Sequence, residues 1–559
     1  MKTLSLPLVL LLLPYLSSAQ APKSTPPPKT DECKISGMVV KLAASEPLRK
    51  AKVQLQSADD RTHSTSIVTD SSGHFELKGI QPGRYKLVVS RSGFVPEEYG
   101  QRKPDDPGAI LTLRPGQEMK DLLFRLIPSA VITGRILDED GEPLALVTVS
   151  ALREVYDEGK RTLATSSAVS TNDLGEYRLF GLQPGRYFVT AVYPHWGRFG
   201  GNGDDSDSAD PQQQGYAKVF YPGTPDAAKA IRIPVKAGEE VPSIEILMRP
   251  VSVYHIRGHV YNEIARKAGT EIRVILMPKR SGREWDFSNR QAIAERKDGE
   301  FTIPEVLPGS YVLMALWFDE GKSFASRLPV DVGNADVDGI ILTISADVSV
   351  SGRVVWDGAP SLQATELSVS LRPKDMGWNF WGSSTRLDAE NSFTLKDVSD
   401  GTYFAEITGE SKDCYIKDVR YGASNALDDG FTVTKGVLAN LEITVSSRGA
   451  RLQGAVADTD GLPATGVQVI LVPEESRRNL HRLYRTGTTD QYGHFEIRGI
   501  APGDYKLFSW DEVESGAWED AEFLKPFEEK AEKVSVQDGD QKTLNLTAIR
   551  TKSPVSAQP

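Results

Sequence analysis

The chain has 559 residues, of which 39% are hydrophobic and 25% charged, values that are ordinary for a globular protein. Its formal net charge of -11 comes from 76 acidic and 65 basic residues spread along the whole chain, which argues against nucleic acid or an anionic membrane as partner. A chain of this length exceeds what one hydrophobic core supports, so a single domain is excluded.

The first 19 residues have the features of a secretory signal peptide. A basic Lys2 precedes an apolar run at 4–13, and the small residues 17–19 end the segment. The apolar run is too short for a permanent anchor, and no other run in the sequence is long enough to span a membrane. Residues 20–32 form a Pro-rich linker. We therefore expect an exported protein without a membrane span, located in the periplasm or outside the cell at its surface.

One sixteen-residue pattern, DSSGHFELKGIQPGRY from Asp70, is written five times with variations. In every copy an aromatic residue is followed eight residues later by a glycine, and two residues further on by a tyrosine. The aromatic residues are Phe75, Tyr177, Phe301, Phe393 and Phe495. The tyrosines are Tyr85, Tyr187, Tyr311, Tyr403 and Tyr505. A fixed spacing that is kept while other residues change predicts one structural unit in five copies.

The first copy indicates the local structure of this unit. Asp70 and Gly73 fit a turn, because the Asp side chain can bond the backbone two residues on and glycine tolerates positive φ. Phe75 and Leu77 then alternate with polar residues, as in a strand with one buried face. A Pro-Gly pair reverses the chain, and the alternation resumes at Tyr85. The pattern predicts a β-hairpin.

Each copy is preceded by two further predicted strands and followed by one. The opening strand contains an interior glycine, which usually marks a bulge or a close approach of another backbone. These glycines are Gly37, Gly134, Gly258, Gly352 and Gly454. Short alternating strands with turns between them, and almost no helical periodicity, predict an all-β protein built of Greek-key β-sandwiches.

We expect five tandem sandwiches and call them repeats 1 to 5. Their ranges are 33–127 for repeat 1, 128–250 for repeat 2 with a polar insertion at 195–215, 251–346 for repeat 3, 347–447 for repeat 4 and 448–549 for repeat 5, with a tail at 550–559. Repeat 5 has the pattern of a short helix near 517–525, against which Trp510 and Trp518 should pack. Each repeat is long enough to bury its own core, so we expect beads in a row with modest contacts between neighbours.

The sequence Pro-Leu-x-x-Ala-x-Val, followed by Thr-Asp-x-x-Gly-x-Phe-x-Leu-x-Gly-Ile-x-Pro-Gly-x-Tyr, resembles the carboxypeptidase regulatory-like domain of exported bacterial proteins. Residues 47–53 and 69–85 carry the match, which recurs in repeats 2 and 5. Repeats 3 and 4 match less well: Arg296 replaces the Asp, while Asn391 and Asp400 replace the turn Gly and the Pro. The resemblance implies a transthyretin-like or collagen-adhesin B-type sandwich that serves as an accessory or structural module, because the carboxypeptidase of the family name is a separate catalytic domain.

Residues for catalysis are not found in the sequence. A metallocarboxypeptidase needs a His-x-x-Glu pair and a distant His to hold zinc, and none of the seven histidines begins such a pair. His255 and His259 would lie about 13 Å apart on one strand, too far to share a metal. No Gly-x-Ser-x-Gly elbow occurs, and the Gly-rich runs are turns rather than phosphate loops. We predict a protein that is not an enzyme and has no cofactor.

Two sets of residues could still hold a metal or form a crosslink. The insertion of repeat 2 could ligate calcium through four acidic residues, Asp204, Asp205, Asp207 and Asp210. It lacks the fixed glycine and terminal glutamate of a calcium loop, so a solvated polar loop is the alternative. The two cysteines, Cys33 and Cys414, could pair in an exported protein or stay as separate thiols.

Aromatic side chains in two predicted loops are candidates for binding a carbohydrate or a partner. They are Trp196, Trp378, Phe380 and Trp381. Flat rings on loops suit stacking against sugars or partner side chains, or they fold back to cap a sandwich. The sequence therefore predicts a structural or adhesive binding protein with a polysaccharide or a cell-envelope protein as partner. The alternatives are a polysaccharide-binding protein that uses these aromatics, and an accessory part of a peptidase system.

Overall fold

The computed structural model describes residues 31–551, except 43, 60–62, 194–213, 264–270, 280–289, 295–297, 320–321, 345–347, 360–365, 375–382 and 437–438. It is nearly all β, with 59% strand and 5% helix, and its described strands form eleven sheets. The predicted all-β fold of β-sandwiches is confirmed. We keep the predicted repeat ranges as labels for parts of the chain.

Repeats 1 and 2 each contain two main sheets. Repeat 1 has the sheets β4-β1-β8 and β3-β2-β5-β6, with β7 beside β5, formed by β1 (Cys33–Lys41), β2 (Lys52–Ser57), β3 (Ser64–Val68), β4 (His74–Ile80), β5 (Gly83–Ser90), β6 (Glu97–Glu98), β7 (Leu111–Leu113) and β8 (Glu118–Leu126). Repeat 2 has β12-β9-β17 with β18 beside β9, and β11-β10-β13-β15 with β16 beside β13, formed by β9 (Ala130–Leu137), β10 (Thr148–Asp157), β11 (Lys160–Ser170), β12 (Glu176–Leu182), β13 (Gly185–Val192), β15 (Val219–Phe220), β16 (Ile233–Val235), β17 (Glu240–Val241) and β18 (Ile246–Leu247), with the 3-10 turn η1 (Ala227–Lys229).

Repeats 3 and 4 follow the same plan. Between repeats 2 and 3, β14 (Gln214–Tyr216) pairs with β19 (Pro250–Ser252). Repeat 3 has β23-β20-β26 and β22-β21-β24-β25, formed by β20 (Tyr254–Asn262), β21 (Ile272–Pro278), β22 (Arg290–Ala294), β23 (Glu300–Val306), β24 (Gly309–Asp319), β25 (Lys322–Val332) and β26 (Val337–Ile344). Repeat 4 has β30-β27-β35-β32-β33 and β29-β28-β31-β34, formed by β27 (Val348–Asp357), β28 (Ser368–Pro373), β29 (Ser384–Arg386), β30 (Ser392–Val398), β31 (Gly401–Thr408), β32 (Tyr415–Tyr421), β33 (Ser424–Asn425), β34 (Phe431–Val433) and β35 (Leu441–Ser446).

Repeat 5 adds short helical segments to two sheets. The sheets are β39-β36-β42 and β38-β37-β40-β41, formed by β36 (Ala450–Ala457), β37 (Gln468–Pro473), β38 (Arg485–Thr488), β39 (His494–Ile500), β40 (Gly503–Trp510), β41 (Glu532–Val536) and β42 (Gln541–Thr547). The helical segments are η3 (Glu475–Arg477), η4 (His481–Leu483), η5 (Ala517–Glu519), α1 (Ala521–Leu524) and η6 (Lys525–Lys530). Helix α1 lies within the segment for which the sequence predicted a helix, and Leu524 packs there with Trp510 and Trp518. Within the described part of the chain, no helix is long and apolar enough to cross a membrane.

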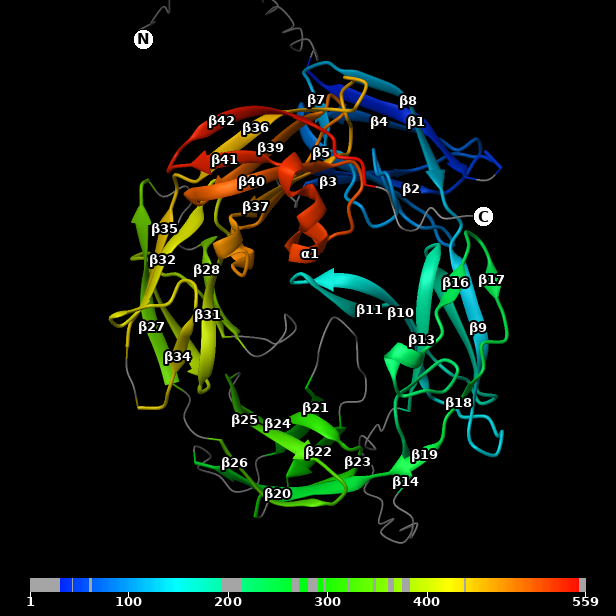
Figure 1. The fold of residues 1–559 in the computed structure, drawn as a ribbon, viewed down its shortest axis with the longest axis vertical. Helices are drawn as coiled ribbons and strands as arrows, with labels where there is room; N and C mark the ends of the chain where they lie inside the picture. Colours follow the sequence, from blue (N-terminus) through cyan, green and yellow to red (C-terminus); the bar gives the residue numbers. More distant parts are fainter. Residues whose placement is uncertain are drawn as a thin grey trace, which may run out of the picture.

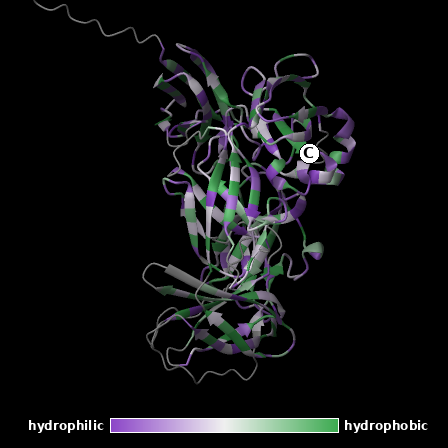
Figure 2. Cartoon of the chain, turned by 90° about the vertical axis from the view of Figure 1, so that its left-hand side faces the viewer, coloured by the Kyte–Doolittle hydropathy of each residue, from purple (hydrophilic) through white to green (hydrophobic). Residues whose placement is uncertain are grey.

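A buried core lies between the two sheets of each repeat. Hydrophilic and hydrophobic residues alternate along the strands in Figure 2, as expected for strands with one buried face. On β4, for example, Phe75 and Leu77 are buried while Glu76 and Lys78 are exposed. The corresponding aromatic residue is buried in all five repeats. The alternation read from the sequence therefore identified the core-facing side of these strands correctly.

The two strands of the repeated pattern do not form a β-hairpin, which corrects the prediction. Strand β4 pairs with β1, whereas β5 pairs with β2 in the facing sheet. The same division separates β12 from β13, β23 from β24, β30 from β31 and β39 from β40. The Pro-Gly connection thus carries the chain from one sheet of the sandwich to the other. Alternation alone could not show this, because one face is buried in either arrangement.

The tyrosine of the pattern closes this corner between the sheets. Its hydroxyl donates a hydrogen bond to the backbone carbonyl four residues earlier, over 2.7 to 2.9 Å in every repeat. The pairs are Tyr85 with Gln81, Tyr187 with Gln183, Tyr311 with Leu307, Tyr403 with Ser399 and Tyr505 with Ala501. A carbonyl between two sheets needs such a partner, because the strand ladders do not supply one. This explains why the tyrosine keeps its spacing.

Replacing this hydroxyl should loosen one corner without breaking the fold. We expect Tyr505→Phe to destabilise repeat 5 by about 1 to 2 kcal/mol, because the partly buried Ala501 carbonyl loses its donor. Hydrogen exchange of peptides from β39 and β40, followed by mass spectrometry, measures this locally. Tyr261→Phe is the control, since Tyr261 is 52% exposed, and it should change exchange little. Equal effects of the two substitutions would contradict the role of the corner.

The turn before the pattern strand forms as predicted in repeats 1, 2, 4 and 5. In repeat 1 the Asp70 Oδ1 accepts hydrogen bonds from the backbone N–H groups of Ser72 (2.8 Å) and His74 (2.9 Å). Gly73 takes φ of 73°, and in repeat 4 Asn391 takes the same position with φ of 62°. Asparagine tolerates this left-handed region better than most residues, so the departure from the pattern preserves the turn.

The interior glycine of each opening strand lies against the backbone of the closing strand. A Cβ added at Gly454 would overlap the carbonyl of Leu544 on β42, which runs parallel to β36. Equivalent overlaps occur at Gly37, Gly134, Gly258 and Gly352. The structure shows the close approach of a second backbone at all five glycines, and at Gly37 and Gly258 the pairing with the closing strand also shifts register, as at a bulge.

The repeats are arranged in a closed ring rather than in a row, which corrects a second expectation. In Figure 1 the chain runs around the ring from blue to red, and the strands of repeat 5 return beside those of repeat 1. A bridge between Ile110 and Asp490 joins the two repeats directly. Contacts between residues almost 400 positions apart are invisible to local sequence patterns, so the sequence could not predict the closure.

Candidate functional site

The largest set of specific contacts between distant parts of the chain joins repeats 1 and 5. We call it the closure seam and define it by Arg84, Thr112, Asp490, Gln491 and Glu496. These residues come from β5, β7, β39 and the turn that precedes β39. The seam holds the first and last described repeats together, so we treat it as the candidate functional site.

Gln491 binds the edge strand β7 as a second strand would. The backbone N–H of Thr112 donates to the Gln491 side-chain oxygen (2.9 Å), and the Gln491 amide donates to the Thr112 carbonyl (2.5 Å). The Thr112 hydroxyl donates to Asp490 Oδ2 (3.0 Å). Asp490 is 7% exposed, and its other oxygen accepts two N–H groups of its own turn. One carboxylate therefore shapes the turn and holds repeat 1.

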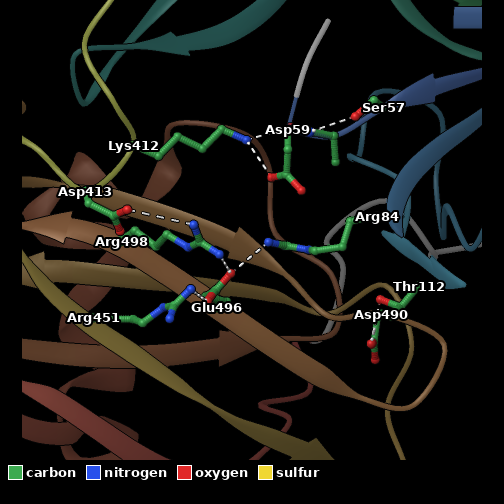
Figure 3. A network of polar contacts seen from close by, with 11 residues as sticks. Ser57, Asp59, Arg84, Thr112, Lys412, Asp413, Arg451, Asp490, Glu496 and Arg498 are labelled. Carbon is green, nitrogen blue, oxygen red and sulfur yellow. Dashed lines mark hydrogen bonds and ion pairs between the residues drawn. The ribbon is translucent and has the colours of Figure 1, made fainter. Parts of the chain in front are cut away.

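A second part of the seam is centred on the Glu496 carboxylate. Figure 3 shows three arginines pointing toward it from two repeats. Arg84 of repeat 1 lies 2.7 Å from Glu496 and Arg498 lies 2.8 Å away, and Arg451 also forms an ion pair with it. The Glu496 side chain is only 18% exposed. Ion pairs that are partly desolvated and share several hydrogen bonds contribute more to stability than ordinary surface ion pairs do.

Repeat 4 reaches the same region. The Lys412 ammonium donates to the Ala58 carbonyl of repeat 1 (2.6 Å) and lies 3.3 Å from Asp59 (Figure 3). Asp413 lies 3.9 Å from Arg498 of repeat 5. Repeats 1, 4 and 5 therefore meet in one polar network.

Repeat 2 contacts repeat 5 through the tip of the long β10–β11 strand pair. Tyr156 packs in a core cluster together with Trp518 and Trp510 of repeat 5. Arg161 lies over the Tyr156 ring and 3.7 Å from Glu514. Burial of Tyr156 among side chains of another repeat makes this a packed interface rather than a passing contact.

Protonation of His481 should stabilise repeat 5 through Glu519 and, to a smaller extent, its interface with repeat 2 through Glu158. His481 Nδ1 lies 2.6 Å from Glu519, and this hydrogen bond raises the pKa of His481 above its usual 6.5. The Glu158 carboxylate from the strand tip adds to the rise, while burial and Arg372 oppose it. Because the folded-state pKa is raised, the stabilisation is complete below pH 6.5 and is lost as the pH rises through the raised pKa.

We therefore expect His481 to raise the urea midpoint of unfolding at about pH 6 relative to about pH 8. In His481→Gln this part of the difference between the two pH values should disappear. His74→Gln is the control, because His74 is exposed at the start of β4 in repeat 1. An unchanged pH dependence in His481→Gln would exclude this role of the histidine.

Most sequence-predicted binding residues lie outside the described residues. This applies to the aromatic candidates Trp196, Trp378, Phe380 and Trp381 and to the calcium candidates Asp204, Asp205, Asp207 and Asp210. Both sets stay predictions. In the part of the chain that the structure does describe, no group of three or more His, Cys, Asp or Glu side chains is arranged to hold a metal ion.

The two cysteines do not form a disulfide, which settles one alternative left open by the sequence. Cys33 is buried in the core of repeat 1, where its thiol donates to the Arg114 carbonyl (3.0 Å). Cys414 is buried in the core of repeat 4. Each sulfur packs within its own repeat, so the interpretation as separate thiols is correct for this structure.

Sequence reasoning missed the residues of the closure seam. The turn of repeat 1 contains Ser71 and Ser72, whereas repeat 5 has Gln491 and Tyr492 at these positions. The larger side chains in repeat 5, at positions where repeat 1 has serines, were a detectable signal that this turn makes additional contacts. The partner could not be read from it, since Thr112 is separated from Gln491 by 379 positions.

Facing sheets, buried aromatic cores and tyrosine-closed corners together define a protein of β-sandwich repeats. Residues 34–126 and 131–199 match the model of the carboxypeptidase regulatory-like domain, so the predicted resemblance is confirmed for these two regions. No curated protein sequence matches the chain significantly.

Several solved structures show partial similarity. The Bacillus anthracis TIE protein is 12% identical over 56% of this chain and 50% of that protein, with a TM-score of 0.15. The chain thus spans half the length of that protein. The minor pilin GBS52 of Streptococcus agalactiae is 12% identical over 40% of this chain and 96% of the pilin, with a TM-score of 0.22. A candidate carbohydrate binding protein of Pseudomonas aeruginosa is 20% identical over 16% of this chain and 88% of that protein, with a TM-score of 0.13.

Proposed function

We propose that the chain is an exported structural or adhesive binding protein, without catalytic activity, that acts in the periplasm or at the cell surface. Its β-sandwich repeats would act as a scaffold that presents loops to a polysaccharide or to a cell-envelope protein. Several weak contacts from one rigid scaffold add up, because the first contact raises the effective concentration of the others.

The closure seam is the observation that carries this proposal. A scaffold displays several loops in fixed directions only when its repeats cannot move independently. Polar contacts between repeats 1, 4 and 5, and the packing of Tyr156 into repeat 5, supply that restraint. Without them, tandem domains are expected to move relative to one another.

Binding to isolated envelope material tests the proposal. The mature chain should co-sediment with insoluble envelope polysaccharide or be crosslinked to an envelope protein, and it should release no residues from test peptides. Release of C-terminal residues that a chelator abolishes would overturn the proposal and favour a peptidase system. Failure to bind any envelope fraction would also count against it.

Polysaccharide binding through loop aromatics is the second candidate. The clustering of Trp378, Phe380 and Trp381 within four residues of sequence favours it. Loss of polysaccharide binding in Trp381→Ala, with binding kept in an aromatic substitution such as Trp381→Phe, would support this candidate. Unchanged binding in Trp381→Ala would exclude it.

A further inference from the structure

A cavity of about 480 Å³ lies where repeats 1, 2 and 5 meet. Its lining includes Lys86 of repeat 1, Gln183 from the corner of repeat 2, and Gln468 and Trp518 of repeat 5. Small-molecule sites range roughly from 300 to 1,000 Å³ and occur preferentially where domains meet. The cavity exists only because the ring is closed, and no single repeat contains it.

Hydrogen-bonding groups of both kinds line this cavity. Three side-chain amides line it, those of Gln101, Gln183 and Gln468, and each already bonds within the protein, although an amide has a second N–H to donate. The carboxylates of Asp105, Asp106 and Glu98 accept, and the ammonium of Lys86 donates. Asp105 is already positioned, since Gln183 donates to it over 2.7 Å. Glu98 is held by the N–H of Gly108 (2.8 Å). Fixed partners of this kind keep polar groups in place before a ligand arrives.

Asp106 is a lining carboxylate that is partly buried. Burial raises its pKa to about 6, with Glu512 and Asp105 adding to the rise and Lys103 opposing it. At neutral pH its carboxylate is therefore largely ionised although it is incompletely hydrated. A hydroxyl group that donates to it would replace the missing water.

We propose that this cavity binds a saccharide of one or two rings. Sugar hydroxyls donate and accept, which fits a lining that mixes amides, carboxylates and an ammonium. Asp105 pairs with Arg153 and Glu98 lies 3.9 Å from Lys86, so Asp106 leaves the lining with a net negative charge that disfavours an anionic ligand. The polar lining disfavours an apolar ligand. Trp518 forms part of the wall, although it is only 7% exposed because it packs in the core cluster of repeat 5. The proposal goes beyond a structural role and does not involve the loop aromatics.

Calorimetric titration of the mature chain tests the site. The probes are glucose, N-acetylglucosamine, maltose and cellobiose, with spermidine and citrate as a cation and an anion of similar size. We expect at least one saccharide to bind, and Asp106→Ala to weaken it by about ten-fold or more, because a hydrogen bond to a charged group is lost. Binding of spermidine or citrate alone, or of no saccharide up to its solubility limit, would overturn the proposal.

A second variant separates loss of the site from loss of the fold. Ser515 is exposed at the cavity, so Ser515→Trp should fill it without disturbing a core and should abolish binding. Ser535→Trp on the exposed face of β41 is the matched control and should bind normally. Equal affinity of the two variants would place any saccharide elsewhere. Trp381→Ala should leave this binding unchanged, so failure here is distinguishable from failure of the loop-aromatic hypothesis.

Discussion

Gly454→Ala is expected to destabilise repeat 5 by about 3 kcal/mol, at the upper end of what overpacking usually costs. Alanine in a strand is normally favoured over glycine by roughly 0.5 to 1 kcal/mol, so open space at this position would give the opposite sign. The added methyl group would overlap the Leu544 carbonyl, which belongs to the backbone and cannot rotate away. Strands β36 and β42 would have to separate, and their parallel pairing extends over seven residue pairs from Arg451 with Gln541 to Ala457 with Thr547.

Hydrogen exchange of peptides from β36 and β42 measures this effect where it arises. Gly333→Ala is the matched control, because Gly333 has no atom within 4 Å of an added Cβ and its φ is not in the left-handed range. The control should change stability by no more than about 0.5 kcal/mol. If the two substitutions had the same effect, the close approach would not be the reason for the glycine.

Glu496→Ala is expected to open the closure seam and to lower stability by about 2 kcal/mol. Surface ion pairs contribute about 0 to 1 kcal/mol, whereas removing one partner of a buried pair costs roughly 3 to 5 kcal/mol. Glu496 lies between these cases, since its side chain is 18% exposed and three arginines would be left facing one another. Small-angle X-ray scattering should show a larger radius of gyration, and exchange near Arg84 should rise.

Glu76→Ala provides the control for this prediction. Glu76 follows Phe75 as Glu496 follows Phe495, so it occupies the same position of the pattern in repeat 1. It pairs with Lys78 at 2.7 Å, and its side chain is 48% exposed. Its removal should change stability by less than about 1 kcal/mol and leave the scattering unchanged. A compact Glu496→Ala chain would show that the remaining contacts close the ring without this carboxylate.

The comparison of Glu496 with Glu76 shows how copies of one unit acquire different roles. Core and turn positions are alike in the copies because each sandwich needs the same buried aromatic and the same corner. Outward positions are not fixed by the core, and in repeat 5 Glu496 and Gln491 contact repeat 1. Gln491 replaces Ser71 of repeat 1, whereas Glu496 keeps the residue type of Glu76 and differs only in what it contacts. The contacts that distinguish one repeat from another are therefore made by outward residues, which the sandwich core does not constrain.

The sequence by itself determined the strands, their buried faces and the turns. These depend on residues a few positions apart: Asp70 shapes its own turn, and Phe75 and Leu77 share a face because side chains alternate along a strand. The spacing of Tyr85 was also visible, although its hydrogen bond to Gln81 was not foreseen.

Only the tertiary structure decided which strands pair, how the ring closes and where the cavity lies. Alternation fits a hairpin and a corner between sheets equally well, so it could not distinguish them. Contacts such as that of Gln491 with Thr112 depend on the directions in which whole sandwiches follow one another, and small angles accumulate over the intervening 379 positions. No local pattern of residues specifies the total of these angles. Packing and hydrogen bonding across the closure seam favour the arrangement in which the ring is closed.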